Sequence, residues 1–145
     1  MNDMLPTTAP DIRATRAVTD GVGLLLTYYA QPGDEPLAVT EFLYLAWLGT
    51  EWYPDGNAQE ARPAGEPLPP VQFLSGGYVT QGDLIAFAGG VVADALVHEV
   101  SVTFNDGSQQ VVRVERGAYL AVQLGVEGVR RVEALDDQGQ TLHRH

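Results

Sequence analysis

Short runs of alternating apolar and polar residues, each closed by a turn signal, fill the C-terminal half of this 145-residue chain. From Glu99 to Phe104, apolar side chains alternate with glutamate, serine and threonine, which is the period of a strand with one buried and one solvated face. Asn105, Asp106 and Gly107 follow, and Asn and Gly tolerate the positive φ angles of a tight hairpin turn. A chain built from such units folds into antiparallel sheets.

The same pattern continues to the C-terminus. Further strands are predicted at 112–115, 118–124, 129–135 and 141–142. Turn signals recur about every 8 to 12 residues, which is typical of an antiparallel sandwich or barrel. We therefore predict an all-β chain, a single antiparallel β-sandwich of about seven to nine strands.

The N-terminal half is harder to interpret. Strands are predicted at 71–74 and 84–87, and residues 23–30 suit one arm of a hairpin. The segment 34–49 is open between two structures, because Asp34, Pro36 and Gly49 suit the ends of a helix. Its β-branched and aromatic residues favour a strand that pairs with 23–30, and we adopt the strand.

The length of the chain suits one domain. Residues 1–12 precede any strand pattern and are predicted to be a flexible tail, which leaves 13–145 for a single sandwich domain. Residues 54–70 contain five prolines and few apolar side chains, so they are predicted to form a long surface loop.

Three hairpin motifs carry a resemblance to known domains. They are V-x-V-x-F-x-D-G at 100–107, G-x-Y-L at 117–120 and V-x-A-L-D-x-x-G at 132–139. On these motifs, residues 89–142 resemble small immunoglobulin-like β-sandwich domains found in many uncharacterised bacterial proteins. The resemblance covers about a third of the chain and implies the fold of the sandwich; it transfers no catalytic residue.

The charge balance narrows the choice of partner. The chain has 19 acidic and 8 basic residues, a net charge of -11, and every basic residue is arginine. Nucleic acids and anionic lipid surfaces are held by clustered cations, so we expect neither as a partner. Without lysine or cysteine there is no Schiff-base or thiol chemistry and no disulfide.

The apolar stretches are shorter than the roughly 20 residues that cross a bilayer, so no membrane span is expected. The first six residues have neither the basic nor the apolar region of an export signal. We therefore expect a cytoplasmic protein. Exposed strand edges would allow a homodimer.

Aromatic residues are concentrated in one segment, since seven of the 12 lie between Tyr28 and Tyr53. They either fill the core of a hairpin or form a contact surface, because Trp and Tyr supply large rigid areas. Trp52 and Tyr53, beside the proline-rich segment, are the best contact candidates, together with Trp47. The expected function is thus a non-catalytic protein-interaction module, or alternatively a carbohydrate- or calcium-binding module that uses Trp52 and Tyr53 or the acidic turns.

Acidic turns supply weak candidate metal ligands, which are Asp55, Asp106, Asp136 and Asp137. Their oxygen atoms are of the kind that Ca²⁺ prefers, but Asp is also a common turn residue and the twelve-residue Ca²⁺ loop is absent. We expect no metal and no cofactor. No Gly-x-Ser-x-Gly elbow or other catalytic motif is present, so we expect no enzymatic activity.

Overall fold

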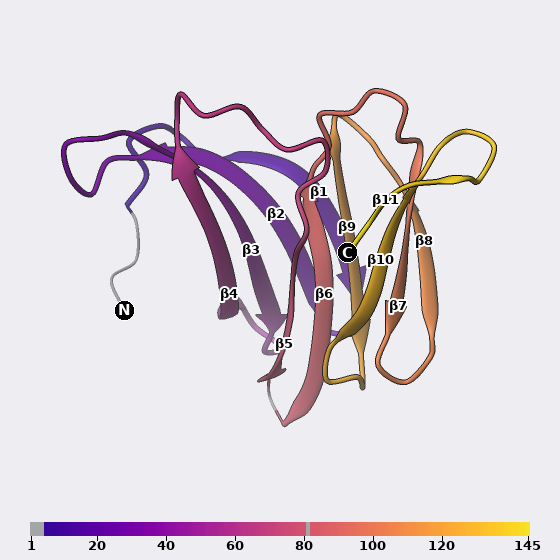
Figure 1. Ribbon diagram of the computed structural model, residues 1–145. Helices are drawn as coiled ribbons and strands as arrows, with labels where there is room; N and C mark the ends of the chain where they lie inside the picture. The colour runs from indigo at the N-terminus through magenta and orange to yellow at the C-terminus, as the bar shows by residue number, and fades with distance from the viewer. Residues whose placement is uncertain (1–4, 81) are drawn as a thin grey trace.

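All regular structure in this protein is β-strand (Figure 1). The computed structural model describes residues 5–80 and 82–145, and within these residues it has eleven strands and no helix. Every strand pairing between named strands is antiparallel. The predicted all-β, antiparallel class is therefore confirmed, while the number of strands exceeds the prediction.

The first sheet is a meander in the order β1-β2-β3-β4. Its strands are β1 (Asp11–Val18), β2 (Gly21–Ala30), β3 (Leu37–Trp47) and β4 (Trp52–Pro63). β2 and β3 pair along their whole length. The segment that the sequence left open between helix and strand is thus a strand, and its hairpin with 23–30 is confirmed.

The other two sheets come from the remaining chain. The second sheet has the order β5-β6-β9, and the third has the order β11-β10-β7-β8. The second is built from β5 (Leu74–Thr80), β6 (Asp83–Val91) and β9 (Ala118–Leu124). The third is built from β7 (Glu99–Phe104), β8 (Gln109–Arg113), β10 (Val129–Leu135) and β11 (Thr141–Arg144).

The second sheet lies between the first and the third, so the molecule has three layers (Figure 1). Successive residues of β6 point to opposite faces: Ala86 and Ala88 pack with the third sheet, and Ile85 and Phe87 pack with the first. Phe87 stacks on Phe42 of β3, with ring centroids 3.9 Å apart. The predicted single β-sandwich is therefore confirmed only as a sandwich-like stack, which has three sheets because β6 and β9 are apolar on both faces and both faces are covered.

Gln72 is a buried side chain that ties the first sheet to the second. Its Oε1 accepts hydrogen bonds from the Thr40 hydroxyl at 2.9 Å and from the Val91 N–H at 3.1 Å. Its backbone carbonyl accepts from the Tyr119 hydroxyl at 2.8 Å. A Cβ at Gly90 would lie 2.2 Å from this carbonyl oxygen, so only glycine permits so close an approach.

The predicted proline-rich loop at 54–70 is wrong for its first ten residues, 54–63. β4 continues to Pro63 and pairs with β3 over nearly its whole length. Its prolines are tolerated because β4 is the last strand of its sheet, and an edge strand has backbone N–H positions that need no partner. Of the predicted loop, only 64–70 lies outside the named strands.

Two further predictions need correction. Residues 6–12 are no loose tail: Pro6 forms a β-bridge with Ala30, the Thr7 N–H donates to the Tyr29 carbonyl at 2.8 Å, and β1 begins at Asp11. Residues 1–4 of that predicted tail lie outside the described residues. The strand expected at 71–74 instead spans 74–80. A Cβ at its Gly77 would collide with the Glu127 carbonyl, and short-range pattern does not show this close tertiary approach.

Candidate functional site

The face of the first sheet that points away from the second sheet carries a band of apolar side chains. Phe42 is buried against the second sheet, and because successive strand residues alternate, Leu43 and Leu45 lie on the opposite side of β3. The strand register places Leu24 beside Leu43 and Val22 beside Leu45. We call this surface the outer face, and it consists of Ile12, Val22, Leu24, Leu26, Leu43, Leu45, Trp47 and Trp52.

No other sheet of the described chain covers the outer face. The first sheet is an external layer of the molecule (Figure 1). The aliphatic residues of β2 and β3 on this face are only half-buried, and none of them belongs to a buried cluster. The outer face therefore leaves a contiguous apolar surface in water, which is typical of a contact site.

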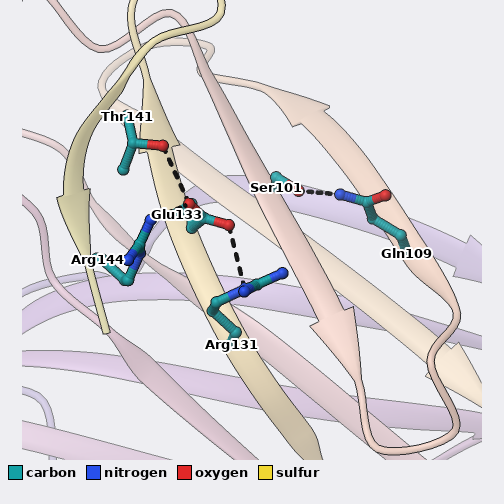
Figure 2. Close-up of polar contacts among 6 residues, drawn as sticks. All are labelled: Ser101, Gln109, Arg131, Glu133, Thr141 and Arg144. Atoms are coloured by element: carbon teal, nitrogen blue, oxygen red, sulfur yellow. Dashed lines mark hydrogen bonds and ion pairs between the residues drawn. The ribbon is translucent and has the colours of Figure 1, made fainter.

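The corresponding face of the third sheet is polar (Figure 2). The Glu133 carboxylate accepts a hydrogen bond from the Thr141 hydroxyl at 3.0 Å and pairs with Arg144 at 3.0 Å and Arg131 at 3.1 Å. Figure 2 shows these side chains together on β10 and β11, outside the core. The third sheet thus has one apolar and one solvated face, as the alternation in its sequence predicts.

The structure divides the predicted aromatic candidates. Trp47 and Trp52 are paired across β3 and β4 with ring centroids 5.2 Å apart, and they are 39% and 51% exposed. Tyr53 is 49% exposed, but its register partner Ala46 is buried on the inner side, so Tyr53 does not share the outer face. Phe42 is buried in the core.

The aliphatic part of the outer face was missed at the sequence level. Residues 22–26 read V-G-L-L-L and 42–47 read F-L-Y-L-A-W, so both strands are apolar on both faces. Near-continuous apolar runs are typical of strands covered on both sides. The apolar runs at 22–26 and 42–47 are therefore visible in the sequence. Only the structure shows that no second sheet of the described chain covers one of the two sides.

A cavity of about 420 Å³ lies on the outer side of the first sheet around Glu41. The Glu41 carboxylate accepts hydrogen bonds from the Tyr28 hydroxyl at 2.7 Å and from the Gln59 amide at 3.1 Å, both at Oε1. Its Oε2 accepts from the Asn57 amide at 3.3 Å. The apolar part of its lining comes from Pro6, Pro10, Leu26, Leu43 and Pro54.

A second cavity, of about 230 Å³, lies at the β3–β4 turn, between the ends of the first and second sheets. Tyr44 and Thr80 line it together with Trp47 and the carboxylates Asp20 and Asp83. Burial raises the pKa of the Tyr44 hydroxyl, and nearby carboxylates raise it further. The Thr80 hydroxyl is buried with no hydrogen-bond partner among the described residues.

The four predicted metal-ligand candidates are not brought together. Asp106 and Asp136 lie in turns at opposite ends of the third sheet, and Asp55 lies on β4. Asp106 accepts hydrogen bonds from the Ser108 hydroxyl and N–H, and these bonds lower the pKa of its carboxyl. Within residues 5–80 and 82–145, no group of three or more His, Asp or Glu side chains is placed to hold a metal ion.

Comparison with protein-family models, with curated proteins and with solved structures found no match to this chain. The part of the chain that the structure describes has no helix long and apolar enough to span a membrane.

Proposed function

We propose that this chain is a non-catalytic protein-interaction module that binds its partner through the outer face. The observation that carries the proposal is that the outer-face leucines of β2 and β3 stay only half-buried, whereas Tyr28, Ala30 and Val39 on the same side are buried. An apolar face of this kind gains free energy when a partner removes it from water. Trp47 and Trp52 add the large aromatic side chains that dominate many protein interfaces.

We also propose that the second and third sheets form an immunoglobulin-like sandwich to which the first sheet is added. The support is the strand order: counted from β5, the first, second and fifth strands share one sheet, and the third, sixth and seventh share the other. This is the arrangement of the immunoglobulin fold, except that the fourth strand, β8, pairs with the third strand, β7.

The proposed contact surface is tested by replacing its two central leucines. Leu24→Thr together with Leu43→Thr removes apolar area while keeping good strand-forming residues. Val111→Thr is the matched control, because Val111 is an exposed valine on β8 of the third sheet. We expect proteins retained from a native extract by immobilised wild type and by Val111→Thr to be lost from the double variant. An identical retained set for all three proteins would contradict the proposal.

A second candidate function is ligand binding at the cavity beside the β3–β4 turn. Trp47 offers a ring face for a sugar, and Asp20, Asp83 and the unpartnered Thr80 hydroxyl offer groups that bind sugar hydroxyls. Thermal unfolding with a panel of oligosaccharides, and separately with Ca²⁺ and EDTA, tests this candidate. A ligand at a hundredfold excess over Kd adds about 2.7 kcal/mol of stability. If none of these additions changes the unfolding temperature, the ligand-binding candidate is contradicted.

A further inference from the structure

We propose that the cavity around Glu41 receives one cationic side chain, arginine or lysine, from the partner protein that docks on the outer face. This inference rests on the proposed function and specifies the chemistry of the partner. The cavity lies among the apolar residues that the outer face would bury, since Leu26 and Leu43 belong to both. A partner that covers Leu26 and Leu43 therefore also covers Glu41.

The Glu41 carboxylate is held in place by neutral donors. Tyr28 and Gln59 donate to Oε1, and Asn57 donates to Oε2. The Gln59 amide also donates to the Tyr28 hydroxyl at 2.8 Å, so the donors support one another. A carboxylate has about four acceptor positions. Three are used, and the position that remains is on Oε2.

The charge of Glu41 is not neutralised by the chain itself. None of the ion pairs among the described residues includes Glu41. A partner that brought only apolar groups would bury this carboxylate without a counter-charge, which is unfavourable. A partner that brings a cation converts the same group into a source of affinity and specificity.

The walls of the cavity suit the stem of a long cationic side chain. Pro6, Pro10 and Pro54, with Leu26 and Leu43, line the same cavity as the carboxylate and supply apolar atoms to it. Arginine and lysine bury their methylene groups against apolar surface while the charged end makes polar contacts. The net charge of -11 would also attract a basic partner over a distance.

The test is a titration of the full-length, ¹⁵N-labelled protein with n-butylguanidinium, followed by amide chemical shifts. We expect saturable shifts at Leu26, Glu41, Leu43, Asn57 and Gln59, and none with n-butylurea, which is similar in shape but neutral. Equal shifts with the two compounds, or no shifts around Glu41, would overturn the proposal, and this comparison needs no variant.

Two variants assign the effect to the carboxylate. Glu41→Gln removes the charge and should weaken binding of n-butylguanidinium by about tenfold or more. Glu99→Gln, on β7 of the third sheet, is the matched control and should bind as wild type does. Equal binding by wild type and a folded Glu41→Gln would overturn the proposal.

The outcomes separate this inference from the proposed function. If the leucine variant loses a retained protein but n-butylguanidinium does not bind near Glu41, the outer face remains the contact surface and the cation site is wrong. If n-butylguanidinium binds but the leucine variant retains the same proteins, the cavity takes a small free cation and the partner's side chain is ruled out. If the wild type self-associates in sedimentation through the outer face, a second copy occupies it and the cationic partner is ruled out.

Discussion

The two external sheets of this protein differ in what they present to water. On the third sheet, apolar residues of β7 point inward and polar residues point outward, and Glu133 binds two arginines on the solvated face (Figure 2). On the first sheet, β2 and β3 are apolar on both sides. Both sheets cover the same middle layer, so the difference concerns only their outer faces. A solvated face needs no partner, whereas under the proposed function the outer face of the first sheet gains from one.

The largest expected effect is a difference in unfolding free energy between substitutions on the inner and outer sides of β3. Phe42→Ala should lower the free energy of unfolding by about 3–5 kcal/mol, because Phe42 is fully buried and stacks on Phe87. Leu43→Ala, the next residue on the open side, should cost only about 1 kcal/mol. Urea unfolding followed by circular dichroism measures both. Equal costs would mean that the outer face is already covered in the isolated protein.

Gln72 connects the first sheet, but not the third, to the middle layer through side-chain bonds. Gln72→Met should cost about 2–4 kcal/mol, because it leaves the Thr40 hydroxyl and the Val91 N–H buried without a partner. Adding Thr40→Val removes one of these unpaired groups, so the double variant should be more stable than the sum of the two single changes predicts. Simple additivity in a double-mutant cycle would argue against the proposed link.

Trp52→Ala should weaken retention of a partner by about 2 kcal/mol of binding free energy, because exposed tryptophans are frequent anchors of interfaces. Its stability should stay within about 0.5 kcal/mol of wild type. Tyr53→Ala is the matched control, since Tyr53 is equally exposed but lies on the other side of β4. Equal losses in the two variants would show that the contact surface is the turn rather than the outer face.

The smallest expected effect is a loss of stability at low pH that arises at the third sheet. Hydrogen bonds from Arg144 and Thr141 lower the pKa of Glu133, and a hydrogen bond from His143 lowers the pKa of Asp94. The folded state then binds fewer protons than the unfolded state. The stabilisation from these two carboxylates is complete above the ordinary pKa values of 4.5 for Glu and 3.8 for Asp. It is lost as the pH falls through the lowered pKa values.

Urea midpoints at pH 5 and pH 3 test this expectation. The wild type should lose more stability between the two pH values than Glu133→Gln, which has no carboxylate to protonate at that position. The same pH dependence in both proteins would show that the Glu133 network does not contribute.

The local turn chemistry made the C-terminal hairpins predictable. Asn105 to Gly107 ends β7, and Gly107 has the positive φ of 87° that such a turn requires. The predictions of a flexible tail and of a proline-rich loop were wrong because β1 and β4 are edge strands whose own sequence patterns are weak. Their strand structure depends on pairing with β2 and β3, which sequence spacing does not reveal.

The sequence by itself determined that the chain is antiparallel β-structure, where most of its hairpins turn, and which strands carry aromatic and aliphatic residues. Only the tertiary structure decided which of those residues are covered. Burial depends on which sheets stack, and stacking joins residues as far apart as Phe42 and Phe87 or Thr40 and Gln72. Two strands with equally apolar patterns therefore end differently: β6 is enclosed between two sheets, whereas no other sheet of the described chain covers the outer side of β2.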